Sequence, residues 1–301
     1  MKSTRKAYGE FLVEIGKDEN VVVLDADLAS ATKTDMFKKE YPTRHIDVGI
    51  AEQDLIGTAC GLALGGKTVF ASTFAMFMAG RAYDQIRNTA AYSHINVNLC
   101  ATHAGVMVGE DGPTHQCIED IALMNVVPTM KVLSPADDIS TKKILSMCMK
   151  EDGPKYIRLG RSDVEDIYDD NFEFKLGGSH VFGEGKDGTV FAYGPTVSIA
   201  LEAKKELEKQ GKYIRVVDLY SIKPVDKEVI LKCAKETEKL VSIEDHSIIG
   251  GIGSIISNIL CEEYPKKLDK IGILDTFGKS GSAKEVYELF GLTKENIMSK
   301  F

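Results

Sequence analysis

Four segments of the chain combine titratable or hydroxyl side chains with glycine or other small residues, and each follows an apolar run typical of a strand. These segments are Asp25–Thr34, Asp47–Glu52, Ser72–Phe77 and His103–Gln116. Parallel strands deliver the loops at their carboxyl ends to one edge of a sheet, where α/β folds hold ligands. We therefore expect the four segments to meet and to place titratable groups beside a bound ligand.

The segment His103–Gln116 is the richest of the four in reactive groups. Its titratable and glycine residues are His103, Glu110, Asp111, His115, Gly105, Gly109 and Gly112. Glycine lets a backbone approach a ligand closely, and functional side chains often stand on loops. This loop is predicted to be part of a ligand site.

Glu52 is the most suggestive single residue, because it stands where a predicted strand gives way to a helix. A carboxylate there can act on a ligand at the sheet edge. For a Glu at such a turn, the favoured interpretation is that it complements the positive end of its own helix. Residue type and position alone leave both interpretations open.

The composition indicates a cytoplasmic globular protein without a nucleic-acid partner. At 301 residues and 44% hydrophobic, the chain is long enough for about two domains. A net charge of −8 argues against a polyanion partner. Six scattered cysteines without a Cys-x-x-Cys pair predict neither zinc nor a disulfide framework and fit a reducing cytoplasm. We expect neither a signal peptide nor a membrane span.

Alternating apolar strands and amphipathic helices predict an α/β fold with a parallel sheet covered on both faces. Expected strands of the first half lie near 21–24, 45–48, 68–71, 95–101, 130–133 and 155–159. One helix is expected over 75–91 and another after the N-cap Ser134 and Pro135. Periodicity fades after residue 162, which predicts domains over 1–162 and 189–301 joined by a linker over 163–188.

The second half repeats the alternation, with strands expected near 189–192, 213–218, 240–243 and 271–275. The turn Gly250–Gly253 lacks the spacing of a nucleotide-binding loop, so a purely structural role is favoured. Glu244, Asp245 and His246 just before it either line a site or form a solvated loop. A capping box at Ser282–Glu285 predicts the start of a late helix.

Several motifs together resemble the transketolases that use thiamine diphosphate. They are Thr102-His103, the run Gly109-Glu110-Asp111-Gly112-Pro113-Thr114-His115-Gln116, the segment Ser72–Phe77 and the Glu52 turn, at matching intervals. The resemblance covers essentially the whole chain. It implies a pyrimidine-binding α/β domain with a parallel sheet, followed by a smaller α/β transketolase C-terminal domain.

The resemblance also implies roles around the cofactor. Glu52 matches the carboxylate that hydrogen-bonds N1′ of the aminopyrimidine ring, and Ile50, Phe74 and Phe77 match residues that contact this ring. A Phe pair at this spacing is otherwise plain helix core. Glu52, His103 and His115 are the expected catalytic residues. Thiamine diphosphate is the expected cofactor.

Further matching positions imply a sugar site. Asp111 and His115 match residues that contact donor hydroxyls, while Arg5, His103 and Arg161 match phosphate-binding positions. Arginine suits phosphate because its planar fork makes paired, charge-assisted hydrogen bonds. Both arginines can alternatively be solvated surface charges. A sulfonate or an unphosphorylated sugar could use much the same site. Ser30, Thr32 and Lys33 should face the same channel, on a weaker match.

One expected motif is missing from the sequence. Transketolases hold Mg²⁺ and diphosphate through Gly-Asp-Gly and a downstream Asn, and no such motif is present. The resemblance therefore implies a split enzyme in which an N-terminal partner subunit supplies Mg²⁺ binding, with self-association giving an α2β2 heterotetramer. No metal ligands are predicted on this chain.

The predicted activity is transfer of a two-carbon ketol unit from a ketose phosphate to an aldose phosphate. One alternative is the β subunit of a 2-oxo acid dehydrogenase, which the Gly109–Gln116 run disfavours. Another is a deoxyxylulose-phosphate synthase, which the run Arg81–Gln85 resembles but the position of His103 disfavours. Gly80 also departs from the tyrosine of many transketolases. A non-catalytic binding module is a further alternative.

Overall fold

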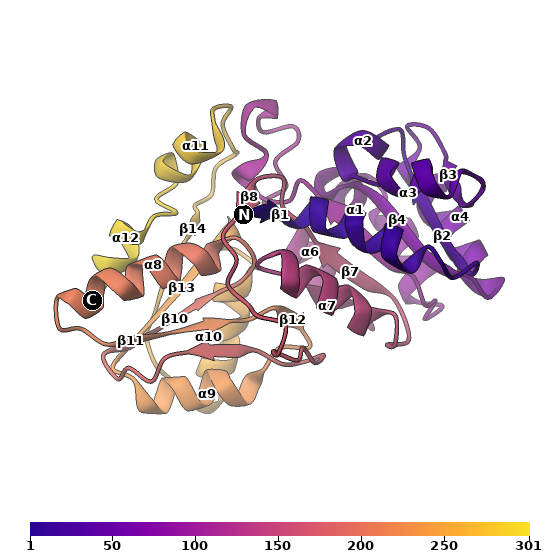
Figure 1. Ribbon diagram of the computed structural model, residues 1–301. Coiled ribbons are helices and arrows are strands. Elements are labelled where there is room, and N and C mark those ends of the chain that lie inside the picture. The colour runs from indigo at the N-terminus through magenta and orange to yellow at the C-terminus, as the bar shows by residue number, and fades with distance from the viewer.

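The computed structural model describes residues 1–301 as two α/β halves, each built on its own sheet (Figure 1). The sheet of the first half has seven strands, in the order β12 (Ser221–Lys223), β6 (Lys131–Leu133), β7 (Lys155–Arg158), β5 (Asn98–Thr102), β4 (Thr68–Phe74), β2 (Val21–Asp25) and β3 (His45–Asp47). All neighbours pair in parallel except β12, which runs antiparallel to β6. The predicted parallel sheet is confirmed.

Helices cover both faces of this sheet, as the alternation of apolar residues requires. In β2, Val21 and Val23 point into one core, and Val22 and Leu24 point into the other. The first core is covered by α1 (Thr4–Ile15), α3 (Asp35–Glu40) and α7 (Asp138–Cys148). The second is covered by α4 (Glu52–Leu64), α6 (Asp120–Val126) and η3 (Ile86–Ala91). Short segments complete this half: α2 (Ala29–Thr32), η1 (Pro42–Arg44) and η4 (Val106–Asp111).

The second half has a five-stranded sheet that is parallel except for its edge strand β9. Its order is β14 (Leu268–Ile273), β13 (Lys239–Ser247), β10 (Gly188–Ala192), β11 (Ile214–Asp218) and β9 (His180–Phe182). One face packs on α8 (Thr196–Lys209) and α12 (Lys294–Met298), the other on α9 (Lys227–Glu236) and α10 (Ile252–Glu263) (Figure 1). Helix α11 (Ala283–Leu289) lies between β14 and α12 in the sequence.

The two halves share structure as well as a boundary. Strand β12, which follows β11 in sequence, completes the sheet of the first half. The largest apolar core contains residues of both sheets, among them Leu99 and Phe191. A short pair, β1 (Lys2–Ser3) with β8 (Asp163–Val164), lies at the boundary. Both β8 and β9 fall within the predicted linker 163–188.

The register of the central strands sets the position of the four reactive segments. Asp25 pairs with Asp47 and with Ser72, and Phe74 pairs with Thr102. The carboxyl ends of β5, β4, β2 and β3 therefore lie at one edge in adjacent order. This is the arrangement that the sequence predicts.

The helix expected over 75–91 is interrupted. It consists of a π-helical turn η2 (Met76–Arg81), a short α5 (Tyr83–Gln85) and the π-helical η3. π-Helical turns are rare and often stand at functional sites. Here the first one follows β4 directly and determines where Phe77 and Arg81 point.

The predicted N-cap at Ser134 and Pro135 is wrong. Helix α7 begins at Asp138, because Asp137 accepts a hydrogen bond from Ser140 N at 2.8 Å and closes a capping box. The backbone N–H of Ser134 instead donates to Tyr220 O beside β12. Of the two possible caps, the structure uses Asp137, and Ser134 pairs with the residue before β12.

The Gly250–Gly253 turn has the structural role expected of it. Glu244 accepts hydrogen bonds from Ile252 N at 2.8 Å and Gly253 N at 3.1 Å, so the start of α10 is capped by the chain's own carboxylate. Burial raises the pKa of Glu244 to about 8. Glu244, Asp245 and His246 are all fully buried, so the solvated-loop interpretation is wrong.

All six cysteines are free, and five of them are buried. None of the helices has the length and apolar character that crossing a membrane requires. The capping box predicted at Ser282 and Glu285 is present at the start of α11.

Candidate active site

Glu52 is the first residue of α4 and is 2% exposed. Its Oε1 accepts a hydrogen bond from Arg81 Nη1 at 2.6 Å, and its Oε2 accepts none within the chain. Glu52 thus lies at the N-terminus of its helix and against the Arg81 guanidinium. A buried carboxylate with one oxygen free can hydrogen-bond a ligand.

Arg81 is a site residue that sequence reasoning did not connect with Glu52. Its guanidinium lies 4.5 Å from the centroid of the Phe77 ring and also forms an ion pair with Glu52. The two partners stand 29 positions apart, and no local spacing links them. The π-helical turn η2 supplies the geometry that carries Arg81 back to the start of α4.

Four rings form an aromatic group beside Glu52. Phe74 stacks on His103 with centroids 3.8 Å apart and on Phe77 at 5.6 Å. His115 meets Phe77 edge-on at 5.3 Å and Phe74 at 6.1 Å. The Phe pair is therefore not plain helix core, since Phe74 ends a strand and both rings face histidines of another loop. A flat ligand ring fits beside such faces.

His103 is buried and carries a defined tautomer. Arg5 Nη1 lies 3.2 Å from His103 Nε2, and because arginine can only donate, Nε2 accepts. Nδ1 therefore carries the proton and donates to Thr102 Oγ1 at 2.9 Å. Burial, together with the positive charges of Arg5 and Arg161, lowers the pKa of His103 to about 3. The ring is neutral at physiological pH.

Arg5 and Arg161 form the positive side of the site. Arg5 donates to Ala31 O at 2.9 Å, but its Nε is buried without a partner. Burial and the charge of Arg161 lower the pKa of Arg5. Arg161 bonds to Val108 O and lies 3.2 Å from Asp111 Oδ2. An unpaired buried donor costs free energy, so an anion beside Arg5 would relieve it.

The Asp25–Thr34 segment is braced by its own first residue. Asp25 accepts hydrogen bonds from Thr32 Oγ1 at 2.7 Å and from Thr34 Oγ1 at 3.0 Å, and burial raises its pKa to about 6. Thr32 is thus buried in a structural role. Lys33 donates to Ser30 O on the outside of this loop.

The structure brings most of the predicted site residues together. One contact chain runs from Glu52 through Arg81, Phe77, Phe74 and His103 to Arg5, and His115 contacts both phenylalanines. Arg161 pairs with Asp111, and its charge acts on Arg5 and His103. Ile50 stands outside this chain and is 77% exposed. Among residues 1–301, no three His, Cys, Asp or Glu side chains gather as metal ligands.

Comparison with protein families identifies both halves. Residues 1–166 match the transketolase pyrimidine-binding domain, and residues 177–297 match the transketolase C-terminal domain. Glu52, with an oxygen that has no partner in the chain, and the stacked rings Phe74 and Phe77 belong to the half that matches the pyrimidine-binding domain. The fold and the site thus define the pyrimidine side of a thiamine diphosphate-dependent enzyme.

Three individual relatives narrow this class to one family. A transketolase C-terminal section of Methanocaldococcus jannaschii is 46% identical over 99% of this chain and 95% of its own length. The 6-deoxy-6-sulfo-D-fructose transketolase subunit of Clostridium sp. MSTE9 is 38% identical over 98% of this chain and 92% of its own length. An apulose-4-phosphate transketolase subunit of Phocaeicola vulgatus is 37% identical over 99% of this chain and 96% of its own length.

A solved structure agrees with them. A split-gene transketolase, described as an inactive β4 tetramer, superposes with a TM-score of 0.92 at 46% identity, covering 100% of this chain and 97% of its own. The chain belongs to the transketolase family and matches the C-terminal section of split transketolases over its whole length.

The low pKa of His103 predicts a specific dependence of stability on pH. The unfolded chain binds a proton at His103 below about pH 6.5, and the folded chain binds it only near pH 3. The free energy of unfolding should therefore fall as pH drops through this window. His103→Gln should make that fall shallower, by at most about 1.4 kcal/mol per pH unit, in denaturant titrations.

His94, whose side chain is 52% exposed, provides the matched control. His94→Gln should follow the unsubstituted chain across the same pH range. An unchanged slope in His103→Gln would contradict a neutral, buried ring in the folded chain.

Proposed function

We propose that this chain is the pyrimidine-side subunit of a split transketolase that transfers a two-carbon ketol unit between sugar phosphates. The supporting observation is the contact chain from Glu52 to Arg5 along one sheet edge, with the Arg161–Asp111 pair whose charge acts on Arg5. A carboxylate stands at one end, aromatic rings lie in the middle, and an arginine pair stands at the other. This order suits a nitrogen ring next to a phosphorylated sugar.

Glu52 and the aromatic group would hold the cofactor's pyrimidine. Glu52 Oε2 would hydrogen-bond N1′ of the ring, with Phe74 and Phe77 against its face. Arg81 would keep Oε1 occupied, so that the carboxylate presents the other oxygen. Thiamine diphosphate, when bound, supplies the nucleophilic thiazolium carbon.

The histidines and the arginine pair would orient the donor sugar. His103 is neutral, so a sugar hydroxyl that replaced Arg5 or Thr102 as the partner of one ring nitrogen would meet no charge on the imidazole. His115 and Asp111 would contact further hydroxyls. Arg5, with its unpaired Nε, and Arg161 would bind the terminal phosphate.

A partner polypeptide would complete the site. Mg²⁺ and the diphosphate would be held by an N-terminal transketolase subunit, and two copies of each would form a heterotetramer. Two relatives are described as subunits of transketolases, and a third homologous chain forms an inactive β4 tetramer. This inactivity supports the dependence on a partner.

Reconstitution tests the proposal. The purified chain, mixed with an N-terminal transketolase section, thiamine diphosphate and Mg²⁺, should convert xylulose 5-phosphate and ribose 5-phosphate into sedoheptulose 7-phosphate. Product is measured by mass spectrometry, and each component alone is the control. Absence of turnover across phosphorylated ketoses, with the complex assembled, would refute a sugar-phosphate transketolase. Turnover of a sulfo-sugar donor would instead assign the activity of the Clostridium relative.

The assignment of Glu52 predicts the effect of an isosteric change. Glu52→Gln in the reconstituted enzyme should lower kcat by about 10²–10⁴-fold, the usual contribution of a positioned proton-transfer group. Asp54→Asn, an exposed carboxylate two residues further along α4, should leave kcat unchanged. Full activity of Glu52→Gln would rule out its catalytic role.

The arginine pair predicts discrimination between donors. Arg161→Ala should raise KM for a phosphorylated ketose about 10–100-fold, because a hydrogen bond to a charged group is lost. KM for an unphosphorylated ketose should change far less. Arg87→Ala, an exposed arginine outside the contact chain, is the control. Equal effects of Arg161→Ala on both donors would argue against a phosphate contact.

A further inference from the structure

The loop that carries Asp111 and His115 has an unusual backbone conformation. Three of its residues, Gly105, Gly109 and Gly112, have φ angles of +73°, +77° and +74°. Their ψ angles of −162°, −116° and −166° place them in backbone regions that glycine alone enters readily. Glycine also has the greatest backbone freedom when unfolded. The loop has hydrogen bonds of its own, among them those from Gln116 Nε2 to Val106 O and Gly109 O, but contacts from outside add to them.

Those contacts come from the second half of the chain. A Cβ atom added at Gly105 would lie 1.9 Å from Asp245 Oδ2, and one at Gly112 would lie 2.2 Å from Ser280 Oγ. The loop backbone is thus pressed against two different segments of the C-terminal domain. Figure 1 shows α11 beside this loop, and α11 packs on η4.

Two hydrogen bonds join the same surfaces, one buried and one partly buried. Asp245 Oδ1 accepts from Val106 N at 2.8 Å, at the start of the loop. Gln116 Nε2 donates to Lys279 O at 2.8 Å, at its end. Gly278 lies so close that a Cβ there would stand 1.7 Å from Gln116 Oε1. Both ends of the loop are therefore held from the C-terminal domain.

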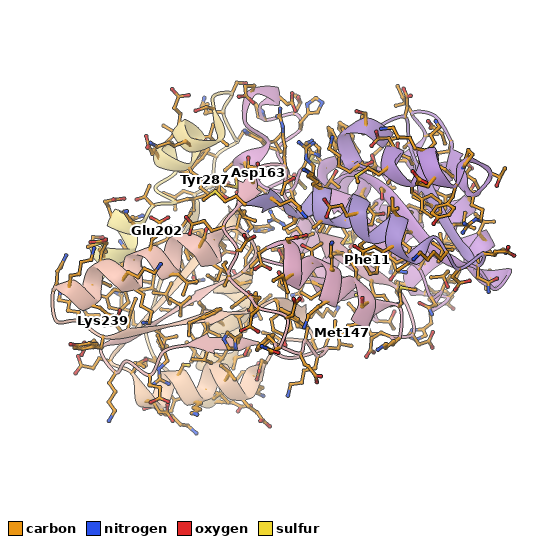
Figure 2. The ribbon with its side chains drawn as sticks, in the orientation of Figure 1. Phe11, Met147, Asp163, Glu202, Lys239 and Tyr287 are labelled. Atoms are coloured by element: carbon orange, nitrogen blue, oxygen red, sulfur yellow. The ribbon has the colours of Figure 1, made fainter.

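Asp245 is itself held firmly at the domain boundary. Its backbone oxygen accepts from Arg158 Nη2 at 2.7 Å, and Arg158 pairs with Asp120 at 2.9 Å, both buried. Burial raises the pKa of Asp245, while Arg158 and the Val106 N–H oppose the rise. Tyr287, which is also at this boundary in Figure 2, is buried there.

We propose that the C-terminal domain is the template for the substrate loop, with Asp245 and the segment Gly278–Ser280 acting as positioning elements. Asp245 holds the first N–H of the loop, and Lys279 O holds Gln116. Through them the domain sets where Asp111 and His115 stand, without touching a ligand. The kinetic part of this inference rests on the proposed transketolase function.

The proposal predicts a selective effect on the donor. The contacts of Glu52 with Arg81 and of Phe74 with Phe77 lie outside this loop, so cofactor binding should depend on the template far less than donor binding does. Asp245→Ala leaves the buried Val106 N–H without an acceptor. In the reconstituted enzyme, KM for the donor ketose should rise about 10-fold, the equilibrium effect of one lost buried hydrogen bond. The Kd for thiamine diphosphate should change less than about 2-fold.

Amide hydrogen exchange on the isolated chain gives a readout that requires no activity. Exchange of peptides covering residues 103–117 should speed up about 10-fold in Asp245→Ala. Asp245→Asn keeps an oxygen that can accept from the Val106 N–H. Its loop exchange rate and its KM for the donor should therefore stay close to those of the unsubstituted chain. Gln116→Met removes the bond to Lys279 O together with two bonds inside the loop, to Val106 O and Gly109 O. Gly278→Ala crowds Gln116 from the C-terminal domain and removes none of these donors. Both variants should loosen the end of the loop, which keeps the test decisive if Asp245→Ala fails to fold.

Asp218→Ala is the matched control. Asp218 is fully buried in the second sheet and accepts from Tyr168 Oη at 2.7 Å, away from the loop. The Asp218→Ala variant should be less stable than the unsubstituted chain, but the amides of residues 103–117 should not exchange faster. Wild-type loop exchange in folded Asp245→Ala, Gln116→Met and Gly278→Ala, or an equal rise in Asp218→Ala, would overturn the proposal. Lack of turnover by the unsubstituted enzyme would instead refute the proposed function, while the exchange result would still decide the positioning role.

Discussion

The structure of the site depends on parallel pairing of four central strands. Because β5, β4, β2 and β3 are neighbours in parallel register, every loop after their carboxyl ends opens at the same edge. Each of these loops supplies a different kind of group: carboxylates after β2 and β3, aromatic rings after β4, histidines after β5. A single antiparallel strand among them would have sent one loop to the opposite edge. The site can therefore form only if these four strands pair in parallel.

Charge in the site is separated along that edge. Glu52 lies at one end with Arg81 as its counter-charge, and Arg5 and Arg161 lie at the other. Stacked Phe74 and neutral His103 lie between them. A ligand with a basic ring at one end and an anionic group at the other is complementary to this order. The uncharged middle also keeps the two ends from neutralising each other directly.

The boundary between the two halves is a packed interface, with a buried polar group beside the apolar core that both sheets share. The Arg158–Asp120 pair and the carboxylate of Asp245 are buried there, and burying charges is tolerable only when each has partners. Strand β12 crosses the boundary into the first sheet. These features make the C-terminal domain part of the site's framework, although none of its side chains is among the site residues, which extend from Glu52 to Arg5 and the Arg161–Asp111 pair.

The sequence by itself determined the α/β alternation, the parallel sheet, the loops that carry chemistry and the resemblance to transketolases, because apolar periodicity and compact motifs are local properties. The tertiary structure alone decided which groups meet. Arg81 reaches Glu52 across 29 positions, and Asp245 reaches Val106 across 139. It also chose Asp137 over Ser134 as a helix cap and buried Glu244, Asp245 and His246. These outcomes depend on strand order and domain packing, whose energies come from residues far apart in the chain and leave no local spacing to read.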